Sequence, residues 1–135
     1  MKPIQTYNIV LADEDEDDYF FLKDILEETK QATLYRARNK QYLFQYLDSA
    51  AVPDAIFIGF SEHNNDVREC LRTIRNQPQY LSVPLIIYSD VINFSEMEDM
   101  YEIGANMYIR KPTSSEQLKL SMTHFINLFL KNYSA

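Results

Sequence analysis

The chain has 135 residues, of which 46% are hydrophobic and 24% charged, and its formal net charge at pH 7 is -7. This length accommodates one domain with a single sizeable core and leaves little room for two. The acidic balance argues against nucleic-acid binding through a basic face, because phosphate neutralisation needs clustered Lys and Arg.

The single cysteine, Cys70, cannot form an internal disulfide and fits a reducing compartment. Its place in a helical pattern predicts that it is buried as a small hydrophobe. No apolar run approaches the roughly 18 residues that a membrane-spanning helix needs, and the opening MKPIQTYN lacks the apolar core of a signal peptide. We therefore expect a soluble, cytoplasmic protein without membrane contact.

Short apolar runs alternate with helical patterns along the chain. The first run, NIVLA at residues 8–12, is nearly continuous in apolar residues and is followed by acids, which is typical of a strand buried on both faces. The elements predicted after it are, in chain order, helix 19–28, strand 32–37, helix 39–47, strand 55–60, helix 66–75, strand 83–89, a fourth helix, strand 107–110 and a last helix.

The last two helices carry start and stop signals. Ser95 with Glu98 and Thr113 with Glu116 have capping-box spacing, and Gly104 stands where a helix favours a left-handed terminator. The last helix should bury one stripe and leave Leu120, His124 and Leu128 on its outer face. The predicted stripe comprises Leu118, Met122, Phe125, Phe129 and Tyr133.

Strand-then-helix alternation predicts one α/β domain over residues 1–135, with a doubly wound, five-stranded parallel sheet and helices on both faces. In this architecture, functional side chains gather at the carboxyl ends of the strands. The side chains expected there are Asp13, Glu14 and Asp15, residues 59–62, Ser89 and Asp90, and Lys111.

Four segments together resemble the receiver domain of response regulators in two-component signalling, over essentially the whole chain. They are IVLADEDEDDYFFL, PDAIFIGF, VPLIIYS and IGANMYIRKP. The resemblance implies a flavodoxin-like sheet of order 2-1-3-4-5. It also implies a pocket formed by Asp13, Glu14, Ser89, Tyr108, Lys111 and Pro112.

Gly59 departs from this resemblance, because it occupies the position of the family's phosphorylated aspartate. Receivers transfer a phosphoryl group to a carboxylate, helped by a divalent cation and a lysine. Glycine offers no nucleophile, and Asp54 stands at the other end of the strand. An alternative interpretation of Gly59 is a strand end where the backbone must approach another group closely.

The missing carboxylate also weakens the expected metal site. Mg²⁺ prefers octahedral oxygen ligands, and Asp13 and Glu14 alone predict weak binding and no tightly held cofactor. Lys111 should instead act as a fixed counter-charge for Asp13 or Glu14. The resemblance further implies a cis peptide bond between Lys111 and Pro112.

Several of these residues have an equally strong structural interpretation. Asp17 and Asp18 fit a solvated helix start, where the helix dipole favours acids. Ser89 and Asp90 fit an ordinary turn, and Tyr108 fits a half-buried strand aromatic.

We expect a non-enzymatic pseudo-receiver without an output domain that binds other signalling proteins (a kinase, a phosphotransfer protein or an effector) independently of phosphorylation. By analogy, the fourth helix, fifth strand and fifth helix form its partner face or a homodimer face. One alternative is a working receiver phosphorylated on Glu62 or Asp90. Another is a flavodoxin-like small-molecule binder, although the loop after the first strand is acidic and does not resemble a phosphate cradle.

Overall fold

The computed structural model describes residues 6–29, 32–60, 64–91 and 93–130. Its strands are β1 (Tyr7–Ala12), β2 (Ala32–Ala37), β3 (Ala55–Ile58), β4 (Leu85–Ser89) and β5 (Met107–Arg110). Its helices are α1 (Glu16–Thr29), α2 (Lys40–Ser49), α3 (Asn64–Arg75), α4 (Phe94–Ile103) and α5 (Ser115–Phe125). A 3₁₀ turn at Pro78–Tyr80 precedes β4, and a π-helical turn at Ile126–Leu130 extends α5.

The five strands form one parallel sheet in the order β2-β1-β3-β4-β5, as predicted. Strand β1 pairs with β2 on one side and with β3 on the other, so that Ile9 lies between Leu34 and Ala55. All carboxyl ends of the strands therefore lie at one edge of the sheet.

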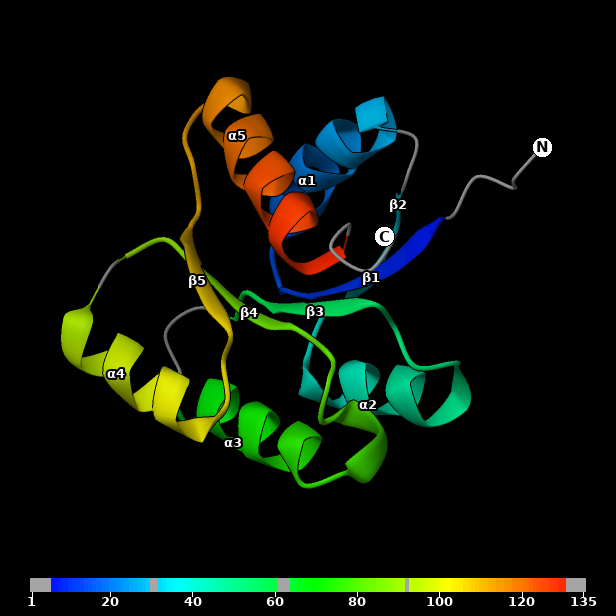
Figure 1. Ribbon diagram of the computed structural model, residues 1–135, viewed down its shortest axis with the longest axis vertical. Coiled ribbons are helices and arrows are strands. Elements are labelled where there is room, and N and C mark those ends of the chain that lie inside the picture. Colours follow the sequence, from blue (N-terminus) through cyan, green and yellow to red (C-terminus); the bar gives the residue numbers. More distant parts are fainter. Residues whose placement is uncertain (1–5, 30–31, 61–63, 92, 131–135) are drawn as a thin grey trace.

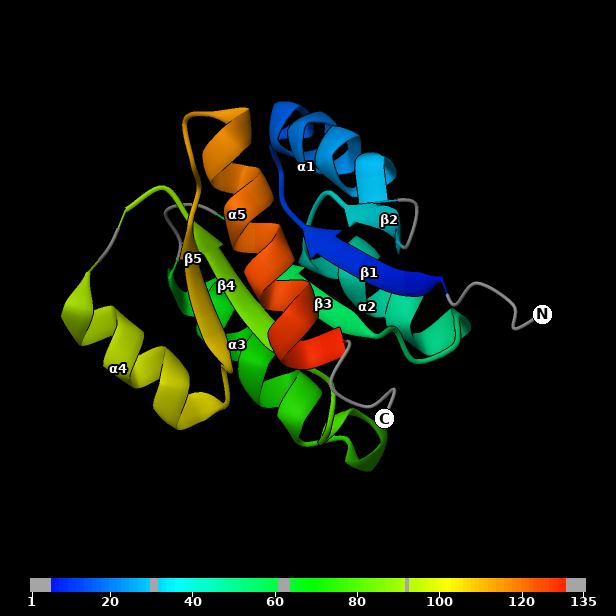
Figure 2. The same ribbon diagram turned by 45° about the horizontal axis from the view of Figure 1, so that its top comes forward.

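Helices cover both faces of the sheet, as Figures 1 and 2 show, and each face carries its own apolar core. α1 and α5 pack on one face, where Phe57 contacts Phe125 with the ring centroids 5.0 Å apart. α2, α3 and α4 cover the other face, and Cys70 of α3 is completely buried there, as predicted. Strands covered on both faces must be apolar throughout, which explains why the sequence shows runs without polar alternation.

The start signals predicted for the last two helices are wrong, whereas the stop signal is right. α4 is capped by Asn93, whose side chain accepts a hydrogen bond from the Glu96 N–H, and α5 is capped in the same way by Ser114. Both caps have the extended backbone that an N-cap needs. Gly104 ends α4 with a φ of 141°, a value that other residues rarely adopt.

The last helix buries Leu118, Met122 and Phe125 as expected, and Phe129 is partly buried. Tyr133 lies outside the described residues. Within the described ranges, none of the helices is both long and apolar enough to cross a bilayer.

Candidate functional site

Lys111 lies at the carboxyl end of β5 and joins three segments of the chain. Its Nζ atom lies 3.0 Å from Oδ2 of Asp13 and 2.7 Å from Oδ2 of Asp18, and it donates a hydrogen bond of 3.1 Å to the carbonyl of Gly59. The Lys111 side chain is 8% exposed and that of Asp13 is fully buried. The expected counter-charge for Asp13 is therefore present.

Asp13 is held in place from both sides. Its Oδ1 atom accepts a 2.9 Å hydrogen bond from the Asp15 N–H, and its own N–H donates to the Ala37 carbonyl. Oδ2 accepts no well-aligned hydrogen bond, so its contact with the ammonium is an ion pair. Burial raises the pKa of Asp13 from its ordinary 3.8 to about 7, and the Asp15 N–H and the Lys111 charge offset only part of this effect.

The pKa of Lys111 is also raised. Burial acts to lower it, but the hydrogen bond to Asp18 and the charges of Asp13 and Asp18 outweigh burial. Two acidic side chains thus share one ammonium; Asp13 and Lys111 are buried, and Asp18 is partly exposed.

The surroundings of Gly59 leave no room for a side chain, whereas its backbone conformation does not require glycine. Its N–H donates a 2.7 Å hydrogen bond to the Ala12 carbonyl, which keeps the chain beside β1. A Cβ atom at this position would lie 2.6 Å from Oδ2 of Asp13 and 3.3 Å from the Tyr88 carbonyl. The Asp13 carboxylate fills the space that a side chain at position 59 would need, so the close-approach interpretation of Gly59 holds for this structure.

Asp18 is the residue that the sequence interpretation left undecided, and the structure places it in the cluster. It lies in the first turn of α1, one turn before the buried Leu22, and so on the face of the helix that points to the sheet. This four-residue spacing from the apolar stripe is the signal that could have identified it.

The cluster does not fit a Mg²⁺ site. Both oxygens of the Asp13 carboxylate are already engaged, Oδ1 by the Asp15 N–H and Oδ2 by the Lys111 ammonium. Glu14 is exposed, and its carbonyl accepts a hydrogen bond from Arg36. Across the described residues, no three His, Cys, Asp or Glu side chains gather as metal ligands would.

Ser89 and Tyr108 meet at the start of the β4–α4 loop. The Ser89 hydroxyl accepts a 3.3 Å hydrogen bond from the Val91 N–H, and the half-buried Tyr108 donates its hydroxyl to the Val91 carbonyl at 3.1 Å. This hydrogen bond agrees with the turn interpretation of Ser89. A cavity of about 350 Å³ opens here toward α4, and both polar and apolar side chains line it. Its lining includes Gly59, Ser89, Asp90, Tyr108 and Lys111, while Glu62 lies outside the described residues.

The peptide bond between Lys111 and Pro112 is trans, so the predicted cis bond is wrong. Lys111 reaches both carboxylates with the trans bond, because its N–H already donates to the Ser89 carbonyl at 2.7 Å and fixes the end of β5.

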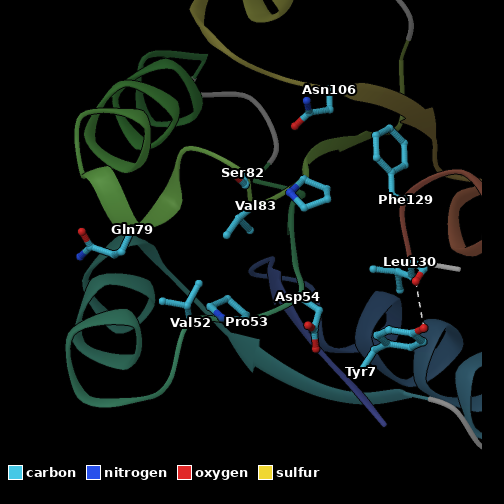
Figure 3. Close-up of a pocket in the computed structure, with 11 residues that line it drawn as sticks. Tyr7, Val52, Pro53, Asp54, Gln79, Ser82, Val83, Asn106, Phe129 and Leu130 are labelled. Atoms are coloured by element: carbon cyan, nitrogen blue, oxygen red, sulfur yellow. Dashed lines mark hydrogen bonds between the residues drawn. The ribbon is translucent and has the colours of Figure 1, made fainter. Parts of the chain in front are cut away.

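A further cavity of about 540 Å³ lies at the amino-terminal ends of the strands, at the opposite edge of the sheet (Figure 3). Tyr7 donates its hydroxyl to the Leu130 carbonyl there, and Asp54 accepts a hydrogen bond from the Asn8 N–H. The residues that line it include no Lys, Arg, His or Cys. Asp54 is therefore remote from Lys111, as predicted, and cannot replace the carboxylate missing at Gly59.

Comparison with known proteins supports the fold. No family model and no curated protein sequence matches the chain. Among solved structures, the phosphorylated cyanobacterial phytochrome response regulator RcpA aligns with a TM-score of 0.81 and 22% identity over 93% of this chain and 95% of that chain. The Mn²⁺-bound response regulator Rcp1 aligns with a TM-score of 0.78 and 18% identity over 93% of this chain and 96% of that chain. A response regulator from Thermotoga maritima aligns with a TM-score of 0.76 and 21% identity over 90% of this chain and 98% of that chain. The chain thus has the fold of response-regulator receiver domains.

Proposed function

We propose that this chain is a receiver-like module of two-component signalling that acts by binding other proteins and accepts no phosphoryl group. The support is the receiver fold combined with a pocket that lacks a nucleophile. Lys111, which in a working receiver would stabilise the transferred phosphoryl group, is here bound to Asp13, Asp18 and the Gly59 carbonyl.

The observation that carries this proposal is the contact between Asp13 and Gly59. An acid at position 59 would have to displace a buried carboxylate that is held by the Asp15 N–H and by Lys111. The space that an acid at position 59 would need is thus filled by the Asp13 carboxylate.

A phosphorylation assay tests this proposal directly. The full chain is incubated with acetyl phosphate and Mg²⁺, and its intact mass is measured, with an ordinary aspartate-containing receiver as positive control. We expect no phosphoryl adduct on this chain. A stoichiometric adduct would overturn the proposal, and its loss in Asp90→Asn or Glu62→Gln would assign the displaced carboxylate.

The same preparation addresses the cofactor expectations. Isothermal titration with Mg²⁺ should show weak or no binding, because the ammonium of Lys111 already compensates the acidic cluster. A bound chromophore or nucleotide in the purified protein would favour the flavodoxin-like alternative.

The surface over α4, β5 and α5 is the proposed partner face. Phe94 at the start of α4 is 76% exposed and Leu120 of α5 is 72% exposed, and Val91 and Tyr101 also face solvent. Arg110 adds an exposed cation on β5. Exposed apolar groups of this size around a charge are typical of a protein-binding surface.

Substitutions on the α4–β5–α5 surface test whether it is the partner face. Phe94→Glu and Leu120→Glu should abolish capture of the partner from lysate of the native cell, whereas Val52→Glu, at the opposite end of the sheet, should not. If all three variants capture the same proteins as the unmodified chain, this face is not the partner face. A homodimer that Phe94→Glu dissociates would show that the face binds a second copy.

A further inference from the structure

β2 is an edge strand with one side open. It pairs with β1 alone, and across the described residues no other strand lies beside it. An edge strand presents unpaired N–H and C=O groups, which can pair with another strand. At six residues, β2 is longer than the opposite edge strand β5, which has four.

The hydrogen bonds of β1 identify the backbone groups at the open edge. The Asp13 N–H donates to the Ala37 carbonyl, so Ala37 directs its backbone groups toward β1. Directions alternate along a strand, and Tyr35 and Thr33 therefore also face β1. Leu34 and Arg36 direct their N–H and C=O groups outward.

Apolar side chains flank this edge on both faces of the sheet. Phe20 of α1 is 48% exposed, and beside it lies a groove of about 330 Å³ that is also lined by Leu34 and Tyr35. On the other face, Tyr35 is 38% exposed and stacks on Tyr46 of α2 with the ring centroids 3.9 Å apart. Rings that are already held in place lose little conformational entropy in an interface.

Arg36 does not block the edge, although charged side chains usually protect such strands. Its guanidinium lies against the loop between β1 and α1. It donates hydrogen bonds of 3.1 Å to the carbonyls of Asp13 and Glu14 and lies 3.7 Å from the Glu16 carboxylate. The usual protection is therefore absent at the centre of β2.

The geometry points to a second copy of this chain as the occupant, with β2 pairing antiparallel to β2 of that copy across a two-fold axis at Tyr35. The outward groups of Leu34 then bond those of Arg36 in the other copy, and the two five-stranded sheets form one continuous sheet. Tyr35 faces its own equivalent in a non-hydrogen-bonded pair, where side chains come closest.

The charges agree with this register. Arg36 lies opposite Leu34 of the other copy, so no two like charges face each other, whereas a register centred on Arg36 would oppose two guanidinium groups. Phe20, Leu34 and Tyr35 supply apolar surface near the axis, and the Arg36–Glu16 ion pair lies beside Leu34 of the other copy. The charge of Arg36 is thus already compensated within its own copy.

Sedimentation equilibrium of the full chain, from micromolar to near-millimolar concentration, tests the pairing. We expect a reversible monomer–dimer equilibrium that strengthens with salt, because each copy carries a net charge of -7. Tyr35→Lys should weaken the dimer by at least about tenfold, because it opposes two ammonium groups at the axis. Phe94→Glu, on the α4–β5–α5 face, should leave the dimer unchanged.

Cysteine cross-linking tests the register. Opposite residues of a non-hydrogen-bonded pair lie within disulfide reach, so Tyr35→Cys should cross-link rapidly on oxidation. Thr33→Cys is the matched control, because Thr33 lies opposite Ala37 of the other copy and should cross-link much more slowly. The native Cys70 is buried and takes no part.

Hydrogen exchange gives a readout without substitution. Exchange of the Leu34 and Arg36 amide hydrogens should slow on dimerisation. The exchange rate of the Tyr35 amide, which already faces β1, should not change. A monomer at every concentration, or a dimer that Phe94→Glu dissociates and Tyr35→Lys does not, would overturn the inference. These outcomes are independent of the phosphorylation assay, because β2 pairing does not involve Gly59 or Lys111.

Discussion

Oδ2 of Asp13 lies 2.6 Å from the position that a Cβ atom on Gly59 would occupy, so a buried carboxylate fills the volume of an absent side chain. The same oxygen lies 3.0 Å from Nζ of Lys111. Glycine at position 59, the acid at 13 and the ammonium at 111 therefore form one packing unit, and changing one member affects the other two.

Gly59→Ala should lower the free energy of unfolding by about 1 to 3 kcal/mol, because the added methyl group overpacks against the Asp13 carboxylate. Urea denaturation measures the difference. In an Asp13→Ala background, the same substitution should cost much less, since the clashing atoms are gone. Equal costs in the two backgrounds would show that Asp13 does not fill this space.

The pKa of Asp13 gives stability a distinctive pH dependence. In the unfolded chain the Asp13 carboxyl group loses its proton near pH 3.8, whereas in the folded protein burial raises its pKa to about 7. The folded state thus binds the proton more tightly, and stability should fall as pH rises from about 4 to 7, by roughly 1 to 3 kcal/mol. Denaturation of Asp13→Asn over the same range is the control, and its stability should change less. Parallel curves for the two proteins would contradict the assignment.

Lys111→Met should destabilise the protein by about 1 to 3 kcal/mol at pH 8, because Asp13 loses its counter-charge and must take up a proton above its pKa of about 7, and Asp18 loses its partner. Lys119→Met is the matched control. The Lys119–Glu28 pair has a similarly short distance of 2.8 Å, but its side chains are 50% and 56% exposed, so its loss should cost less than about 1 kcal/mol. Similar losses for the two variants would refute the structural role of Lys111.

Arg75 joins α3 to the ends of two other segments. Its guanidinium donates to the carbonyls of Gly104, Tyr80 and Val83 at 2.7 to 3.0 Å. Lysine cannot reach all three, so Arg75→Lys should cost about 2 kcal/mol or more. Arg72→Lys, at an exposed position of the same helix, should change stability by less than about 0.5 kcal/mol in the same thermal or urea assay.

The helix ends show where local sequence patterns are ambiguous. Ser95 and Thr113 have capping-box spacing, but Asn93 and Ser114 form the caps. Several polar residues near a helix start can accept the same N–H bonds, and the path of the preceding loop decides which one has the extended backbone. Gly104 had no such competitor, because no neighbour tolerates its φ of 141° as easily.

Apolar runs and helical repeats in the sequence predicted the five strands and the helices between them, because strands buried on both faces must be apolar and helices must repeat every 3.6 residues. The resemblance to receiver domains implied the order of the strands. The sequence also placed Asp13, Gly59 and Lys111 at one edge of the sheet. Three features are apparent in the folded chain alone: Asp18 shares the ammonium of Lys111, the Asp13 carboxylate fills the space at Gly59, and the peptide bond before Pro112 is trans. Such contacts depend on excluded volume and on distances between segments far apart in the chain, which no local pattern encodes.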